Sequence, residues 1–143
     1  MLQRLETHRD NFIISTDLSR LDVDAIADML AGAYWAQGRT SQMIVRYLQH
    51  SLTFGLYDGP RQIGLARVVS DYTTFAWLCD VFIHKEYRGQ GLGKWLMETV
   101  HSHPDLQGLR RWILTTKDAH GLYRQFDWVP LEPPERWMMK IDG

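Results

Sequence analysis

Three glycines fall within five residues directly after an arginine, and this run has the spacing of an anion-binding loop. It consists of Arg88, Gly89, Gln90, Gly91, Leu92 and Gly93. Before it, residues 81–83 have the apolar pattern of a buried strand, and after it apolar residues recur at helical spacing. A strand, a glycine turn and a helix start present free backbone N–H groups and the positive end of a helix dipole. We therefore predict a phosphate-binding loop here.

The spacing excludes the two best-known glycine-rich phosphate loops. A Walker A loop, G-x-x-x-x-G-K-S/T, would need glycine where the chain has Arg88 and Ser or Thr where it has Trp95. A dinucleotide-binding G-x-G-x-x-G would need a third glycine at Lys94 or at Leu96. The loop therefore belongs to another class of phosphate binder.

The composition is that of an ordinary soluble globular protein. The 143 residues are 45% hydrophobic and 23% charged, with a net charge of −1, and we expect one domain spanning residues 1–143. A near-neutral chain without a dense basic patch is not expected to bind nucleic acid. Cys79 is the single cysteine and the six histidines lack metal-ligand spacing, so we expect neither an internal disulfide nor a metal site.

The chain lacks the sequence signals of membrane insertion or export. No stretch approaches eighteen consecutive apolar residues, and the first twelve residues have no apolar signal core. We therefore expect a cytoplasmic protein without a membrane partner. Monomer and homodimer both stay open.

The order of elements predicts an α/β fold. Apolar patterning and turn residues predict strands at residues 11–16, 52–57, 62–69, 75–83, 111–116 and 137–141, with the second and third forming a hairpin. Helices are expected to begin near Asp22, near Thr40 or Ser41, after the glycine loop, and at Asp118, which is expected to cap the last one. This order predicts a mixed, mostly antiparallel sheet with one parallel strand–helix–strand crossover and helices on both faces.

Two motifs together resemble the GNAT acetyltransferase superfamily. Residues 88–93 fit its Gln/Arg-x-x-Gly-x-Gly/Ala signature, and residues 118–128 (DAHGLYRQFDW) are similar to its Asn-Ala-x-x-Leu-Tyr-x-x-x-Gly-Phe motif. The predicted order of elements also matches that family along nearly the whole chain. The sequence departs from the second motif at Asp118, where asparagine is frequent, and at Asp127, where glycine is usual. Aspartate tolerates a positive φ better than most residues, so the match is weakened only slightly.

The resemblance implies that the protein uses acetyl-CoA as co-substrate. Backbone N–H groups of residues 88–94 would hold the pyrophosphate, and residues 81–83 would pair with the pantetheine arm through their backbone. Tyr123 would protonate the CoA thiolate, because a phenol with a pKa of about 10 keeps its proton at neutral pH. The cofactor-binding residues implied in this way are Val81, Phe82, Ile83, Arg88, Gly89, Gln90, Gly91, Leu92, Gly93, Lys94 and Tyr123.

The acceptor side is less closely specified by the sequence. Asp80, beside the cofactor strand, is a candidate base or substrate contact. Asp71 and Tyr72 on a nearby turn, His120, and a water chain are the alternatives. Tyr34 and Trp35 are candidates for lining the acceptor site, which would suit a small-molecule amine, aromatic amines included; simple packing of a helix corner is the other interpretation. The activity expected is N-acetyl transfer by direct attack of the amine, and the alternative is a non-catalytic acyl-CoA-binding or regulatory module. A preference for another acyl-CoA stays open.

Overall fold

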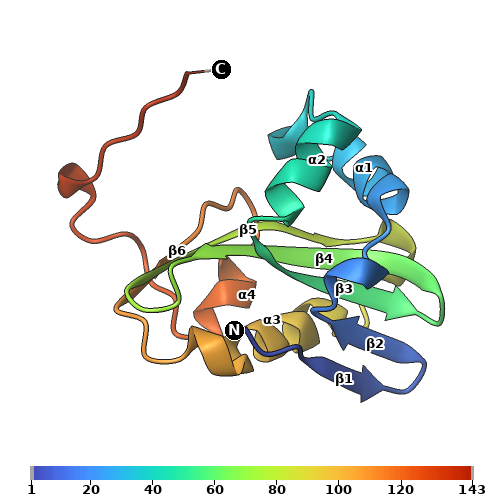
Figure 1. Cartoon of the computed structure of the whole chain (residues 1–143). Helices are drawn as coiled ribbons and strands as arrows, with labels where there is room; N and C mark the ends of the chain where they lie inside the picture. The colour runs from blue at the N-terminus through green and yellow to red at the C-terminus, as the bar shows by residue number, and fades with distance from the viewer. Residues whose placement is uncertain (1, 143) are drawn as a thin grey trace.

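Six strands form one sheet, and two pairs of helices cover its opposite faces (Figure 1). The computed structural model describes residues 2–142, apart from the side chain of Tyr34. The strands lie in chain order, and only β5 and β6 are parallel, joined through α3. This arrangement confirms the predicted fold class. The elements are β1 (Glu6–Arg9), β2 (Phe12–Ser15), α1 (Val23–Ala31), α2 (Ser41–Leu48), β3 (Leu52–Asp58), β4 (Arg61–Ser70), β5 (Phe75–Ile83), α3 (Leu92–Ser102), β6 (Arg111–Ile113) and α4 (His120–Arg124).

Each face of the sheet buries its own apolar cluster. Ile26 of α1 and Ile44 of α2 pack with Leu65 of β4, whereas Leu96 of α3 packs with Phe54 of β3. All five side chains are fully buried, and burial of each contributes about 1.5–3 kcal/mol to folding. The two clusters fix α1 and α2 on one face of the sheet and α3 on the other. Residues on these helices are therefore held in fixed positions relative to the strands.

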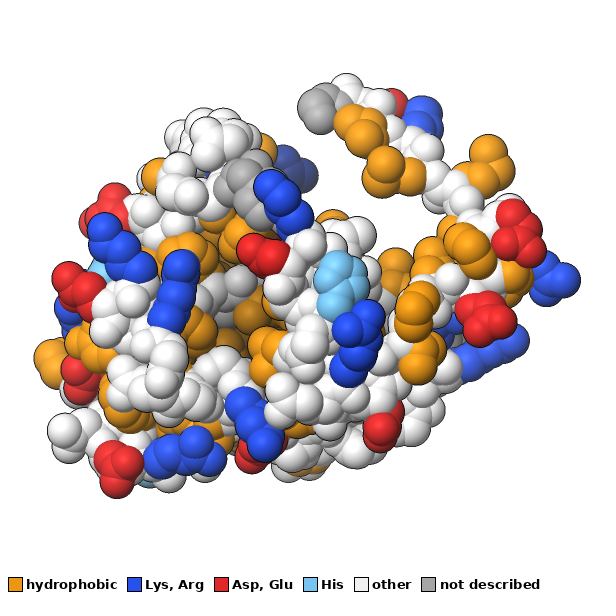
Figure 2. Space-filling model, turned by 180° about the vertical axis from the view of Figure 1, so that it is seen from behind, with side chains coloured by type: hydrophobic (Ala, Val, Ile, Leu, Met, Phe, Trp, Pro, Cys, Tyr) orange, Lys and Arg blue, Asp and Glu red, His pale blue; other side chains and the backbone are white. Residues whose placement is uncertain are grey.

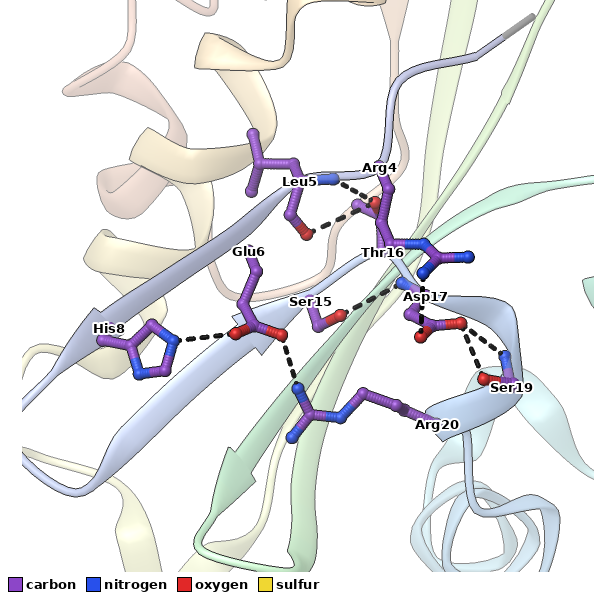
Figure 3. Close-up of polar contacts among 9 residues, drawn as sticks. All are labelled: Arg4, Leu5, Glu6, His8, Ser15, Thr16, Asp17, Ser19 and Arg20. Atoms are coloured by element: carbon purple, nitrogen blue, oxygen red, sulfur yellow. Dashed lines mark hydrogen bonds and ion pairs between the residues drawn. The ribbon is translucent and has the colours of Figure 1, made fainter.

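A hairpin at the N-terminus was not predicted from the sequence. β1 pairs with β2 in four antiparallel steps, although its side chains are mostly exposed. Glu6 ties β1 to the turn after β2 by accepting a hydrogen bond from Arg20 at 2.7 Å (Figure 3). Local contacts add to this: Glu6 lies 2.9 Å from His8, and Asp17 accepts from the backbone N–H of Ser19. Such surface contacts contribute little energy each. β1 forms because β2 offers it an edge, and this is a signal that local apolar patterning does not carry.

The predicted final strand at residues 137–141 is wrong. The segment forms no strand. The Trp137 ring lies 5.0 Å from the guanidinium of Arg111 in β6, and the chain beyond it runs as an extended tail (Figures 1 and 2). Met138 is 98% exposed and Ile141 is 72% exposed. A β-prone run becomes a strand only where a neighbouring strand supplies hydrogen-bond partners, and within the described residues none pairs with this segment.

The predicted cap of the last helix is also wrong. α4 begins at His120, and its N-cap residue is Ala119 rather than Asp118. The backbone N–H of Ala119 donates to the Thr116 hydroxyl at 3.0 Å. Thr116, two residues before Asp118, therefore supplies the side-chain acceptor at the start of this short helix, and the Asp118 carboxylate is exposed.

Gly64 allows β4 and β5 to approach closely next to the predicted cofactor strand. It lies opposite Ile83 in the antiparallel ladder. A Cβ atom at position 64 would stand 2.8 Å from the backbone carbonyl oxygen of Phe82. The obstacle is backbone rather than the end of a flexible side chain, so β5 itself would have to move.

We predict that Gly64→Ala lowers the free energy of unfolding by about 1–3 kcal/mol, as overpacking does in other cores. Guanidinium titration measures this loss directly. Gly121→Ala is the matched control, because a Cβ there meets nothing within 4 Å and the residue lies in a helix. Equal unfolding midpoints for the two variants would contradict the close approach at Gly64.

Candidate active site

β5 and β6 separate soon after they meet, and a cleft opens between them. The two strands pair through only three residue pairs, the last being Trp77 with Ile113. Beyond Trp77, β5 keeps β4 on one side and has no strand on the other within residues 2–142. A cavity of about 790 Å³ lies there, walled by residues 78–81 on one side and residues 115–119 on the other. Residues 78–81 therefore lie along the edge of an open cleft, with no strand paired to them on that side.

β5 carries a bulge where it lines this cleft. Leu65 pairs with Phe82 and Arg67 with Cys79, so one residue of β4 opposes two residues of β5. Asp80 is one of those two and has a φ of 53°, which few non-glycine residues adopt. A bulge turns a strand locally and redirects its side chains. At this bulge the Asp80 carboxylate points into the molecule and lies next to the cleft.

Asp80 is the centre of a buried ion cluster. Its Oδ2 accepts from Nε of Arg67 at 2.7 Å, and its Oδ1 accepts from Nη1 of Arg39 at 2.8 Å. The Asp80 side chain has no exposed surface, while those of Arg67 and Arg39 are 9% and 21% exposed. Breaking such a buried pair by removing one partner typically costs about 3–5 kcal/mol. Asp80 was predicted from the sequence without these ion pairs; an arginine between the apolar residues Ala66 and Val68 of β4 was the available signal.

Tyr123 lies in the wall of the same cavity, across from β5. Its side chain is buried, and burial raises the pKa of its phenol to about 12. The hydroxyl makes no hydrogen bond to any residue that the structure describes. A protonated phenol without a protein partner is able to donate its proton to a group that enters the cleft.

An aromatic cluster holds α4, and with it Tyr123, against α3. The ring of His101 stacks on those of Trp112 and Phe126 at 5.1 and 5.2 Å. Trp128 donates its indole N–H to Nε2 of His101 at 2.9 Å, and Nδ1 of His101 lies 2.7 Å from the carbonyl of Met97. These contacts place the imidazole proton on Nδ1. The sequence analysis did not single out this cluster, because its members come together only in the fold.

Trp128 also contacts the chain at Tyr123 itself. Its backbone N–H donates to the Tyr123 carbonyl at 3.3 Å, and the two rings lie 5.9 Å apart. Asp127 immediately before it has a φ of 69°, so the aspartate adopts the left-handed conformation expected where the motif usually has glycine. The end of α4 is thereby locked next to the phenol.

The glycine loop leaves the start of α3 open. Asp22 and Thr40 cap α1 and α2 with their side chains, but the N-cap of α3 is Gly91, which has no side chain to do so. Gly89 and Gly91 both have a φ of 82°, a conformation that glycine tolerates best. At Gly93 a Cβ would lie 3.9 Å from the Leu122 side chain of α4, an ordinary contact, so packing does not require glycine there. The first-turn N–H groups of α3 consequently have no capping side chain.

Arg88 links the glycine loop to β5. Its Nε donates to the carbonyl of Ile83 at 2.8 Å, and its guanidinium lies 5.2 Å from the centre of the Phe82 ring. Arg88 and Phe82 also line a second cavity of about 540 Å³, together with Met29 of α1. Lys94 is exposed in the first turn of α3. Figure 2 shows a surface hollow floored by hydrophobic side chains with Lys and Arg side chains at its rim.

The candidates for the acceptor side fall in different places. Trp35 lines the 790 Å³ cavity with Arg39 and Trp77, whereas the side chain of Tyr34 lies outside the described residues. His120 is exposed on α4 and is not part of the cavity wall. Val81 lines the cavity, and Phe82 and Ile83 are half-buried beyond it.

Residues 49–130, which include the glycine loop and Tyr123, match the family model of the acetyltransferase (GNAT) domain. The chain belongs to the GNAT acetyltransferase family. A solved structure from Xanthomonas campestris, described as a GNAT-family acetyltransferase, is 45% identical with a TM-score of 0.88, over 92% of this chain and 93% of that one. A Staphylococcus aureus structure at 24% identity and a TM-score of 0.76, covering 92% of this chain and 99% of that one, shares the fold.

Curated relatives match over part of their length. A Gibberella zeae protein named as an acetyltransferase is 33% identical over 112 residues, which cover 64% of this chain and 63% of the fungal protein. A Prochlorococcus marinus protein named as an N-acetyltransferase is 33% identical over 61% of this chain and 51% of its own length. The matched segments thus span less than two thirds of these relatives.

Residues 2–142 include neither a cluster of side chains suited to a metal ion nor a helix suited to crossing a membrane. In that range no three His, Cys, Asp or Glu side chains are arranged to hold a metal ion. Nor does any helix there reach the length and apolar character needed to cross a membrane.

The GNAT cleft includes one thiol. Cys79 lines the cavity, and burial raises its pKa to about 11. A thiol with that pKa is protonated at neutral pH and is a poor nucleophile.

We predict that Tyr123 makes protein stability fall in alkali. Its pKa is raised on folding, so its stabilising effect is complete below pH 10 and is lost as the pH rises toward 12. Between pH 9 and 11, wild-type unfolding free energy should fall by about 1 kcal/mol more than that of Tyr123→Phe. Chemical denaturation at both pH values measures the difference. Parallel curves for the two proteins would contradict a buried, unpaired phenol.

Proposed function

We propose that the protein transfers an acetyl group from acetyl-CoA to the amine of a small-molecule acceptor. The observation that carries this proposal is the combination of three features on the neighbouring elements β5, α3 and α4. They are the unpaired edge of β5, the uncapped N-terminus of α3, and the unpartnered hydroxyl of Tyr123. Together they suit a ligand with amides, a pyrophosphate and a sulfur leaving group.

The glycine loop and β5 would hold the cofactor. First-turn N–H groups of α3 and the dipole of this eleven-residue helix favour a pyrophosphate, and Gly89 and Gly91 let it approach the backbone. The terminal nitrogens of Arg88 and the ammonium of Lys94 would add charge-assisted contacts. Backbone groups of residues 81–83 would pair with the pantetheine amides, as a strand pairs with a sheet edge.

Acetyl-CoA would supply a thioester whose carbonyl carbon is open to attack and whose thiolate is the leaving group. The acceptor would give one proton to water in the open cleft and attack as a neutral amine. Tyr123 would donate its phenolic proton to the sulfur as the carbon–sulfur bond breaks, and would regain a proton from solvent.

The environment of Tyr123 makes this proton transfer reasonable. Burial raises the pKa of the phenol to about 12 and that of the Cys79 thiol, in the same cavity, to about 11. A thiolate desolvated in this cleft would likewise be a stronger base than in water, which favours its protonation by the phenol.

Asp80 would act by positioning rather than as a base. Both of its carboxylate oxygens already accept hydrogen bonds from arginines, and the side chain has no exposed surface. It would hold Arg39 and Arg67 beside the acceptor. Trp35, and Tyr34 next to it in sequence, would line the outer part of the acceptor site.

We predict opposite effects of Lys94→Glu on folding and on cofactor binding. A carboxylate in the first turn of α3 favours the helix dipole and should raise stability by about 0.3–1 kcal/mol. The same charge would repel a pyrophosphate and should weaken acetyl-CoA binding at least about tenfold. Lys94→Gln is the neutral control and should lie between. Isothermal titration that finds equal affinities for all three proteins would contradict the loop assignment.

We predict that Tyr123→Phe lowers kcat by about 100-fold while the Kd for acetyl-CoA stays within twofold. A panel of amines, with release of CoA thiol as the readout, provides the assay. Tyr57→Phe is the matched control, since Tyr57 also carries a buried hydroxyl without a partner but lies outside the cavity. Equal turnover of Tyr123→Phe and wild type would remove the acid role.

A further inference from the structure

We propose that the acceptor carries a carboxylate on the same molecule as its reactive amine, and that Arg39 binds this carboxylate. This inference rests on the proposed acetyl transfer and specifies its substrate class. Three features of the cavity support it: the charge balance, the free donors of Arg39 and the apolar walls beside that residue.

The inner part of the cavity has an excess of positive charge. Arg39 and Arg67 both line it, and the carboxylate they share is that of Asp80. One carboxylate between two guanidinium groups leaves a net charge of +1. At the exposed rim, Lys117 and Asp118 carry opposite charges and add none. A partly buried cation is costly without a counter-charge, so this site favours a ligand that brings one negative charge.

Arg39 is the member of the cluster with donors to spare. Its Nη1 donates to Asp80 and, at 3.1 Å, to the hydroxyl of Tyr47. Its Nε and Nη2 make no hydrogen bond to any residue within the described chain. The Tyr47 ring lies 5.4 Å from the guanidinium and fixes its position. Two adjacent N–H groups on a held, planar guanidinium match the two oxygens of a carboxylate.

The charge of the site favours a carboxylate over a phosphate. A monoanion cancels the single excess positive charge, whereas a phosphate monoester carries nearly two negative charges at pH 7 and would leave an excess of its own. Arg67, at 9% exposure and with its Nη1 bonded to Ser51, is too enclosed to supply a second contact of the same kind.

Aromatic walls flank the proposed carboxylate site. Trp35 and Trp77 line the same cavity, and each is 41% exposed. Apolar surface in this position suits an acceptor whose third substituent is an aromatic or large apolar group. The site thus fits an amine, a carboxylate and an apolar side group on one small molecule, which is the chemistry of an aromatic amino acid.

The test compares acceptors that differ only by the carboxylate. L-Tryptophan and tryptamine form one pair, L-phenylalanine and phenethylamine a second, and phosphoethanolamine supplies an amine with a phosphate. We expect kcat/KM at least tenfold higher for each amino acid than for its decarboxylated partner, and in Arg39→Gln we expect this ratio to fall below threefold through KM. Arg46→Gln is the control, because Arg46 is exposed on α2 outside the cavity and should leave the ratio unchanged.

The outcomes separate this inference from the function on which it rests. Equal rates within both pairs, a preference for phosphoethanolamine, or turnover of none of the five amines would overturn it, even where acetyl-CoA still raises the Tm. A wild type that acetyl-CoA does not stabilise at all would contradict the proposed function itself. Should Arg39→Gln fail to fold, the ratios for wild type and Arg46→Gln decide the matter alone.

Discussion

The early separation of β5 from β6 is the constraint on which the rest of the molecule depends. After Trp77 the strand loses its partner on one side, so a row of backbone N–H and C=O groups faces a cavity instead of a neighbouring strand. Such groups are stable only when water or a ligand pairs with them. β4 pairs with the strand on its other side, and Gly64 allows the two strands to come close. The binding surface is therefore an interrupted sheet, held open by the elements around it.

Two clusters on opposite faces of the sheet hold the cleft in shape. On the α2 side, Arg39 and Arg67 form ion pairs with Asp80 at the bulge of β5. These ion pairs stabilise the positive φ of Asp80, a backbone conformation that costs free energy for a residue other than glycine. On the α3 side, the stacked rings around His101 hold α4 so that Tyr123 meets the cavity. In the proposed reaction the ionic cluster would lie beside the acceptor and the aromatic cluster beside the leaving group. This division matches the two halves of the proposed reaction.

Local patterns in the sequence predicted those features that depend on residues close together in the chain. The glycine loop, the Thr40 cap, the β3–β4 hairpin and the parallel crossover all follow from spacing within a few residues, and the structure contains each of them. The Arg39–Asp80 pair joins residues 41 positions apart, and no local pattern near either residue predicts that the two meet. The apolar run at residues 137–141 shows the converse. Strand propensity there is real, but a strand also needs a partner that only the tertiary structure supplies.

The central claim is that the open edge of β5 and the uncapped start of α3 bind one molecule of acetyl-CoA in line with Tyr123. A crystal structure of the complex with acetyl-CoA tests it most directly. The account predicts the pyrophosphate on the N–H groups of residues 92–94, the pantetheine amides paired with residues 81–83, and the sulfur within hydrogen-bond reach of the Tyr123 hydroxyl. A cofactor bound elsewhere, or a β5 edge that pairs with the protein's own chain in the complex, would contradict it.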